Sequence, residues 1–231
     1  MALSGTKAFE LDVAEYVEEA FERCGLELRT AYDLRTATRS LNLLLADWAN
    51  RGINAWTIKQ YQIPMVQGTA SYYVNSTVPS SVIDVLDVYV RETTGGTTTD
   101  VPLTRMSRAE YALMATKSQT GKPNQFWLDK QASPLMYIWP VPDKSSTYTV
   151  FADALTRMDD AGSGANTVDL PFEFYPSLAS GLAYYISMKR APERMPMLKA
   201  VYDEEFLRAM SQNEERAPYS VAPDLRSYNT A

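Results

Sequence analysis

GTASYYVNSTVPSSVIDVLDVYV (residues 68–90) is the stretch in which the chain changes from helical to strand periodicity. It is rich in Val, Ile and Tyr, residue types that fit a pleated, half-buried surface. The residues before it and those near the end of the chain have the three- and four-residue spacing of amphipathic helices. A strand-rich segment between two helical segments predicts that a β domain is inserted into a helical one.

Two amphipathic helices are predicted before this segment. The apolar positions of the first are Val13, Tyr16, Val17, Ala20, Phe21 and Cys24. Those of the second form one continuous stripe of Leu34, Ala37, Leu41, Leu44, Leu45 and Trp48. Gly25 and Gly52 follow the two stripes as typical helix stops. Thr30 with Asp33 is a weak relative of the capping box, and Trp56 is expected to pack where the chain leaves the helices.

Both helices also carry a charged face. The first presents four carboxylates, from Glu15, Glu18, Glu19 and Glu22. This acidic face is interpreted either as a solvated surface or as one that faces a channel or a basic neighbour. The second helix carries Arg35 and Arg39 one turn apart, available to pair with acidic groups of the same subunit or of an adjacent one.

Six or seven strands are predicted between about Ile58 and Leu155. The segments are TIKQYQIP (57–64), ASYYV (70–74), VIDVLDVYV (82–90), NQFWLDK (124–130), PLMYIWP (134–140) and STYTVFADA (146–154). MVQG is expected to join the first two as a hairpin, and QASP to join NQFWLDK to PLMYIWP. VIDVLDVYV is apolar on both faces, which predicts a central strand covered on both sides. TTGGTTTD (93–100) is expected to be a turn or flexible loop, and Ser107 with Glu110 to cap a short helix through Met114.

Helical spacing returns after the polar segment MDDAGSGANTVD (158–169). One stripe contains Leu178, Leu182, Tyr185 and Ile186, and a second contains Leu198, Tyr202, Phe206 and Met210. Pro171 or Pro176 marks the start of the first of these helices, and both positions stay open. The N-terminal helices are the nearest apolar partner for these stripes. We therefore predict an α+β fold with a discontinuous α-helical bundle (1–57 and 156–212), an inserted antiparallel β-sandwich or barrel (58–155) and an extended C-terminal arm (213–231).

The arm, ERAPYSVAPDLRSYNTA, has no helical or strand period. It nevertheless contains Tyr219, Val221, Leu225 and Tyr228, whereas a purely solvating tail is poor in such residues. Two interpretations are open: a disordered end without a role, or an arm that becomes ordered on another chain.

Composition limits the function. The chain has 231 residues, a net charge of −6 and no histidine. The charge disfavours binding to nucleic acid through the overall field of the protein, because such binding requires Lys and Arg at phosphates. The lack of histidine excludes Ser-His-Asp and Cys-His nucleophile systems and histidine-based metal sites. The single cysteine, Cys24, excludes an intramolecular disulfide and is interpreted as a small core residue.

The sequence shows no phosphate-binding, metal-binding, membrane-spanning or secretion motif. TTGGTTT and GSGAN lack the lysine or the helix of a phosphate-binding loop. No apolar run approaches the roughly 18–20 residues that span a bilayer, and the N-terminus lacks the pattern of a signal peptide. MDDAGSGANTVD, with Asp159 and Asp160, is interpreted as a polar loop, because it does not match an EF-hand. The sequence predicts no catalytic residue, no metal ligand and no cofactor.

From about Tyr16 to Met210 the chain resembles the head-to-tail adaptor (connector) proteins of short-tailed bacteriophages. The residues that carry the resemblance are LNLLLADWANRGINAWTI, the G-x-x-x-Y-x-V strand at 68–74, VPSSVIDVLDVYV, GKPNQFWLD, PLMYIWPVPD, YTVFADALTRMDD and DLPFEFYPSLASGLAYYISM. Each piece alone is weak, and none is a catalytic motif. Their order and spacing together are moderately specific.

The resemblance implies a structural virion protein with no enzymatic activity. Such adaptors form a ring, usually of twelve subunits, beneath the portal protein, extend the DNA channel and provide a platform for the tail nozzle. Their C-terminal segment docks on the portal, which implies portal binding for Tyr219, Val221, Leu225 and Tyr228. DNA passes through without specific binding, no membrane is involved, and the protein is expected in the virion neck after assembly in the host cytoplasm.

Two other functions are considered. A β-sandwich with 15 tyrosines and 4 tryptophans could bind glycans or proteins, although Trp127 and Trp139 lie in strand patterns where core or interface roles are common. A carboxylate-dependent hydrolase is the less favoured alternative, because no acidic pair stands out from the loops.

Overall fold

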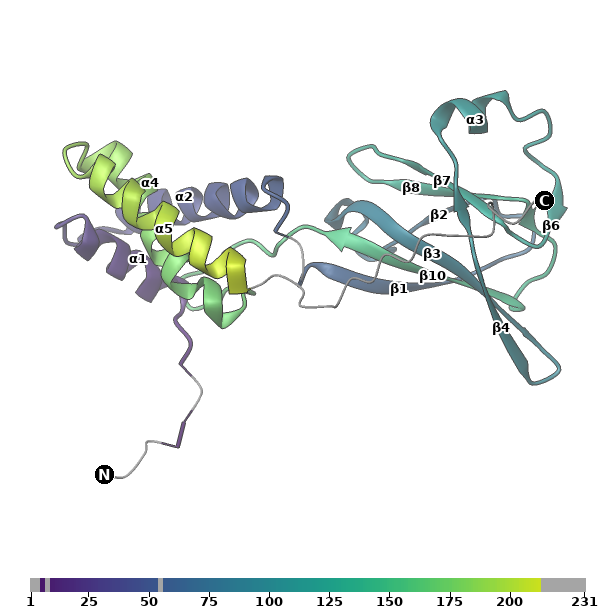
Figure 1. The fold of residues 1–231 in the computed structure, drawn as a ribbon, viewed down its shortest axis with the longest axis horizontal. Coiled ribbons are helices and arrows are strands. Elements are labelled where there is room, and N and C mark those ends of the chain that lie inside the picture. Colours follow the sequence, from purple (N-terminus) through teal and green to yellow (C-terminus); the bar gives the residue numbers. More distant parts are fainter. Residues whose placement is uncertain (1–4, 7–8, 54–55, 213–231) are drawn as a thin grey trace, which may run out of the picture.

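The computed structural model describes residues 5–6, 9–53 and 56–212. A group of helices and a group of strands lie end to end along the long axis of the molecule (Figure 1). The helices at one end are α1 (Val13–Arg23), α2 (Ala31–Asn50), α4 (Tyr175–Arg190) and α5 (Met195–Gln212). The strands of the other end fall between Ile58 and Thr156, in the middle of the sequence.

The helical bundle is assembled from both ends of the described chain, as predicted. α4 packs against α1, α2 and α5, so the N-terminal pair and the C-terminal pair share one core. Trp48 of α2 is fully buried, and its ring centroid lies 5.6 Å from the rings of Phe174 and Phe206. Its indole N–H donates to the Tyr202 hydroxyl at 2.8 Å. The burial of an aromatic side chain with its polar atom paired is strongly favourable.

Close helix packing depends on a glycine in α4. A Cβ atom at Gly181 would lie 2.8 Å from Leu44 Cδ2 and 2.9 Å from Tyr202 Cε2. Neither distance is compatible with ordinary van der Waals contact, so the absence of a side chain lets α2 and α5 approach α4. The helix is buried on several sides, which explains why Tyr185, placed on the apolar stripe from the sequence, is only partly buried.

Helix α2 begins at the predicted capping residue, and α1 has a capping box that was not predicted. The Thr30 hydroxyl accepts from the Asp33 N–H at the start of α2, as expected. Asp12 and Glu15 form a complete capping box at α1 that the sequence analysis did not identify. Pro171 precedes a 3-10 turn, η2 (Phe172–Phe174), and Pro176 lies in the first turn of α4, which resolves the choice left open between these prolines.

The strands form two four-stranded sheets around a second core. The first sheet has the order β1 (Ile58–Pro64), β10 (Tyr148–Thr156), β3 (Val82–Thr94), β4 (Thr97–Pro102). The second has the order β2 (Ser71–Tyr73), β8 (Leu135–Trp139), β7 (Gln125–Asp129), β5 (Thr104–Arg105), and a two-stranded ladder pairs β6 (Thr120–Gly121) with β9 (Val141–Pro142). The pairs are antiparallel except β5 with β7 and β6 with β9. Side chains of both sheets fill the space between them, so this part is a sandwich.

The remaining elements of the β part are short. The 3-10 turn η1 (Pro79–Ser81) precedes β3, and α3 (Arg108–Leu113) lies beside β7. α3 begins with the predicted capping box of Ser107 and Glu110. The QASP hairpin is also confirmed, because β7 and β8 pair antiparallel on either side of it.

One predicted hairpin is wrong. β1 pairs with β10 in the first sheet, whereas β2 pairs with β8 in the second. The segment MVQG therefore crosses between sheets. Met65, at the start of this crossing, is buried, and its N–H donates to the Tyr148 carbonyl at 3.0 Å. Local turn residues could not reveal this, because both strands take their partners from more than 60 residues further along the chain.

The expectation that VIDVLDVYV is covered on both faces is also wrong. β3 is central in its sheet, but the side chains of Ile83 and Leu86 remain 38% and 46% exposed. Ile83 borders a hollow that side chains of α2, among them Leu45 and Ala49, also line. Farther along the strand, Tyr89 stacks on Phe151 at 5.0 Å, and the Arg91 guanidinium lies 4.4 Å from the Phe151 ring centroid. Side chains of the same sheet therefore cover its outer face there.

The segment TTGGTTTD forms a tight hairpin. β3 continues to Thr94, β4 begins at Thr97, and only Gly95 and Gly96 lie between them. Their φ angles are 60° and 84°, as a two-residue type I′ turn requires. The surrounding threonines are β-branched and suit strands.

The two connections between the helical and β parts meet at one point. The Thr57 carbonyl accepts from the Thr156 N–H at 2.9 Å and from the Thr156 hydroxyl at 2.7 Å. Trp56 packs against Phe174 with a centroid distance of 5.0 Å, at the place expected for it. The division into domains at residues 57, 155 and 212 stays a prediction.

Candidate interaction surfaces

The four residues expected to bind the portal are Tyr219, Val221, Leu225 and Tyr228, and they lie outside the described residues. The described part of the chain offers three other surfaces. They are a groove between α1 and α4, an arginine-bearing face of α2 and an aromatic cluster beside α3.

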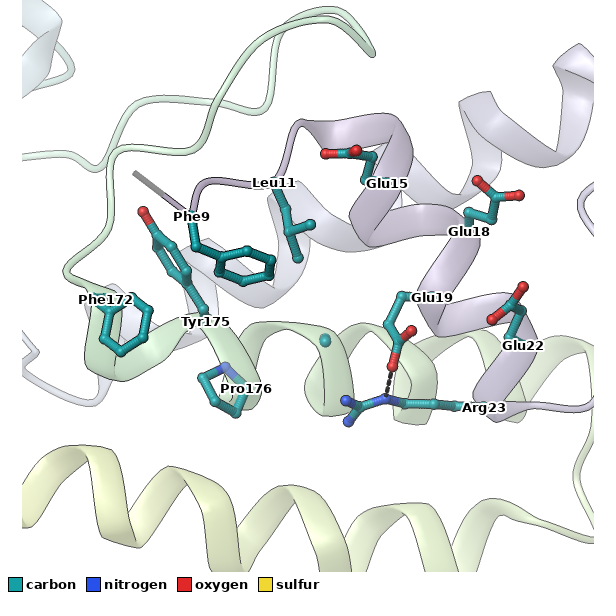
Figure 2. A pocket seen from close by; sticks show the side chains of 11 residues that line it. Phe9, Leu11, Glu15, Glu18, Glu19, Glu22, Arg23, Phe172, Tyr175 and Pro176 are labelled. Atoms are coloured by element: carbon teal, nitrogen blue, oxygen red, sulfur yellow. Dashed lines mark hydrogen bonds and ion pairs between the residues drawn. The ribbon is translucent and has the colours of Figure 1, made fainter. Parts of the chain in front are cut away.

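The groove between α1 and α4 has an apolar part and an acidic part (Figure 2). Its volume is about 500 Å³. Apolar side chains come from the segment before α1, from η2 and from the first half of α4: Phe9, Leu11, Phe172, Tyr175, Pro176 and Ala179. The acidic side chains are the whole carboxylate face of α1: Glu15, Glu18, Glu19 and Glu22. Phe9 and Phe172 are 62% and 65% exposed, so much of this apolar surface is open to solvent.

The carboxylates of α1 differ in their partners. Glu15 completes the capping box with Asp12, and Glu19 accepts from Arg23 at 2.8 Å. In Figure 2 the Glu19 carboxylate points toward Arg23, whereas those of Glu18 and Glu22 point away from it. Within the described residues, Glu18 and Glu22 make no side-chain hydrogen bond or ion pair. The groove therefore carries two carboxylates that are free to bind a cation.

Tyr175 lies in the apolar part of the groove, and its ring centroid is 5.5 Å from that of Phe172 (Figure 2). Burial, with a smaller contribution from the negative charge of Glu10, raises the pKa of its hydroxyl. The hydroxyl is therefore neutral at physiological pH and does not add to the negative charge of the groove.

The second surface is the outer face of α2. Its exposed side chains recur at helical spacing and comprise Tyr32, Arg35, Arg39, Leu43, Ala46 and Asn50. Arg35, Arg39 and Leu43 also border a hollow beside residues 162–164. Neither arginine forms an ion pair or side-chain hydrogen bond with any described residue. The sequence left open whether Arg35 and Arg39 pair with acidic groups of the same subunit or of an adjacent one. Within the described part of the chain, they do not pair with a group of the same subunit.

The third surface is an aromatic cluster on the second sheet. Tyr111 of α3 stacks on Trp127 at 4.8 Å, and Trp127 stacks on Tyr137 at 5.0 Å. The Lys117 ammonium lies 5.5 Å from the centre of the Tyr111 ring. These rings cover one another, whereas a glycan platform needs an open aromatic face. The cluster therefore gives little support to the glycan-binding alternative.

The described residues also give little support to the alternative of a carboxylate-dependent hydrolase. Groups of His, Cys, Asp or Glu suited to a metal ion do not occur among the residues that the structure describes. A general acid requires a raised carboxyl pKa. In the described chain, the carboxyl groups with a shifted pKa are all lowered, namely Asp33, Asp84, Asp100 and Glu110. The described helices also include none long and apolar enough to cross a membrane.

Comparison with known proteins identifies the family. The model of the SU10 adaptor protein family matches residues 12–226, which is nearly the whole chain and includes both the helices and the strands. The chain belongs to the SU10 adaptor protein family. No curated protein matches the sequence.

Membership in this family confirms the resemblance to phage head-to-tail adaptors. The SU10-family adaptor is thus a structural protein of the bacteriophage neck, and this implies a non-enzymatic role. The match ends at residue 226, so it includes Tyr219, Val221 and Leu225 of the arm but not Tyr228. The charged faces of α1 and α2 were evident from the sequence, whereas the groove was not, because Phe9 and Phe172 lie outside the periodic stripes.

Proposed function

We propose that this adaptor forms a ring beneath the portal protein, with the twelve subunits that the resemblance implies. The ring extends the DNA channel and provides the platform on which the tail nozzle docks, after assembly in the host cytoplasm. The observation that carries the proposal is the family match over residues 12–226, together with a helical bundle into which a β-sandwich is inserted.

The charge of the protein supports a role as a channel wall. The net charge of −6 makes the average field of the subunit repulsive to DNA. A lining of the same sign as the phosphates limits adhesion while the genome passes.

The C-terminal arm is the proposed attachment to the portal. Tyr219, Val221, Leu225 and Tyr228 are apolar residues in a segment with no periodic stripe. Two prolines, Pro218 and Pro223, restrict the unbound arm and so reduce the entropy lost on docking. Each buried anchor contributes roughly 1–3 kcal/mol, and repetition around a ring multiplies the effect through avidity.

Truncation tests the proposal. Removal of residues 217–231 is expected to abolish co-sedimentation of the adaptor with its portal. The matched control removes residues 229–231 only, which leaves all four apolar residues in place and should preserve binding. Circular dichroism of both truncated proteins should show the helix content and melting temperature of the full chain.

A truncated protein that folds normally and still co-sediments with the portal in full would contradict the role of the arm. The docking surface would then lie in the helical bundle.

A further inference from the structure

Two surfaces of the helical bundle carry free charges of opposite sign. Glu18 and Glu22 project from the groove on α1, and Arg35 and Arg39 project from α2. None of the four forms an ion pair with any residue in the described part of the chain. Free charge on a groove that also exposes apolar rings is typical of an interface.

The two pairs of charges have the same spacing. Each pair is separated by four residues of α-helix, which corresponds to a rise of about 6 Å. Residues four apart lie on the same side of a helix, so each pair faces one direction. Two helices placed side by side can therefore bring both carboxylates to both guanidinium groups at once.

Exposed apolar side chains accompany the charged pair on both surfaces. Leu43 is 56% exposed and lies one turn from Arg39, and Tyr32 is 61% exposed and lies one turn from Arg35. Phe9 and Phe172 line the apolar part of the same groove that carries the acidic residues (Figure 2). Each surface thus combines a charged pair with exposed apolar side chains, and burying the latter stabilises the contact by about 25 cal/mol per Å².

We propose that the acidic groove of one copy binds the exposed face of α2 of the next copy. Glu18 and Glu22 pair with Arg35 and Arg39, while Leu43 or Tyr32 covers the apolar part of the groove. The two surfaces share no residue, so a copy whose groove is filled still offers its α2 face. Such a heterologous contact adds copies in one direction and closes into a ring when the rotation permits. The inference rests on the proposed ring and names its contact surfaces.

Charge favours a second copy over other occupants of the groove. DNA is repelled by the carboxylates of Glu18 and Glu22, which are unpaired within the described residues. The arm at residues 213–231 contains three acidic residues, Glu214, Glu215 and Asp224, against two arginines, Arg216 and Arg226. The outer face of α2 instead presents two arginines. Both acidic residues of that helix are paired with other residues, Asp33 with Arg190 at 2.5 Å and Asp47 with Arg51 at 2.8 Å.

Cross-linking of the full chain tests the contact. The only cysteine, Cys24, is buried and is replaced in a Cys24→Ser background. Reporter cysteines are then placed on both surfaces by Phe172→Cys and Leu43→Cys. A flexible bis-maleimide added at high protein concentration, with and without portal, should give a ladder of dimers, trimers and larger species. Either reporter alone should give at most dimers.

Charge reversal in the same reporter background tests the ion pairs. Glu18→Lys with Glu22→Lys, or Arg35→Glu with Arg39→Glu, should lower the yield of the ladder at least fivefold. All four substitutions together should restore it to within twofold. Added salt should weaken the wild-type ladder, because exposed charges are screened.

Several outcomes would overturn the contact. The first is a cross-linked ladder that, with portal present, is no stronger for the double-reporter protein than for the single-reporter controls. The second is cross-linking of the double-reporter protein that stops at dimers. The contact would also be contradicted if the charge reversals did not change the ladder, or if the ladder were lost on removal of residues 217–231. Binding of the wild-type chain to portal is measured in parallel. If only the contact between adaptor copies is wrong, the wild-type chain should still bind portal. If the wild-type chain does not bind portal, the proposed function itself is contradicted.

Discussion

Trp48 connects parts of the helical bundle that are far apart in sequence. Its indole N–H bonds Tyr202, 154 residues further along the chain, and its ring packs between Phe174 and Phe206. Leu41, two turns earlier in α2, is also fully buried in the same core. The stability of the bundle therefore depends on a few buried side chains, such as Trp48, through which the N-terminal helices pack against the C-terminal ones.

Replacement of these residues by a charged one should unfold the bundle. Leu41→Asp or Trp48→Asp places an unpaired carboxylate in an apolar core, at a cost of several kcal/mol. Glu18→Gln is the control, because Glu18 is exposed and unpaired within the described chain, and its melting temperature should stay within about 2 °C of wild type. Melting followed by circular dichroism measures both effects. Equal melting temperatures for wild type and Leu41→Asp would contradict the placement of the apolar stripe.

Asp84 connects the two sheets of the β-sandwich. Its carboxylate, on β3, accepts from Arg105 of β5 at 2.8 Å and from Lys130 beyond β7 at 2.6 Å. Burial alone would raise the pKa of this carboxyl. The hydrogen bonds from Lys130, Arg105 and the Val85 N–H, together with the charge of Arg105, outweigh burial, so the pKa is lowered. The charged form is thus favoured by folding.

The pH dependence of stability follows from this lowered pKa. A carboxyl whose pKa is depressed in the folded state adds stability above its unfolded pKa of about 3.9, and this is lost as the pH falls through the folded value. Asp84→Asn should therefore lower stability by roughly 1 kcal/mol at pH 7 and flatten the decline in melting temperature below pH 4. Melting temperatures measured from pH 7 to pH 2.5 provide the test. Parallel curves for the two proteins would show that Asp84 does not contribute.

At the scale of elements, local patterns predicted helices well and strand pairing poorly. The stripes of α1, α2 and α5 follow from side chains three and four residues apart, which interact within one helix. The partners of β1 and β2 depend on contacts with strands far along the chain, and no local turn residue specifies them. At Gly95 and Gly96 the sequence left a turn and a flexible loop both open, and the structure has the turn; two adjacent glycines between β-branched residues are typical of such a hairpin.

The hairpin between β3 and β4 depends on those two glycines. Both have φ in the left-handed region, which costs a β-branched residue about 1–2 kcal/mol or more. Gly95→Val should therefore destabilise the β-sandwich by that amount, whereas Gly95→Asn should be tolerated, since Asn-Gly is a preferred type I′ pair. Urea unfolding of the two variants gives the comparison. Equal stability of the valine variant and wild type would contradict the turn geometry.

At the scale of the whole molecule, the described residues of the adaptor form two cores that share no residue. The bundle carries the acidic groove and the α2 face, and the sandwich extends away from it along the long axis (Figure 1). This arrangement suits a ring in which the bundles contact one another while the sandwiches face another component. The sequence indicated the charged faces but not the groove, which depends on α1 and α4 packing side by side.

Electron microscopy of the adaptor mixed with its own portal tests the central claim most directly. The account predicts a closed ring of adaptor subunits beneath each portal. Without portal, the protein should be largely monomeric at micromolar concentration, because the contacts between copies are small and partly charged. Portals that remain bare in the presence of excess folded adaptor would contradict the account.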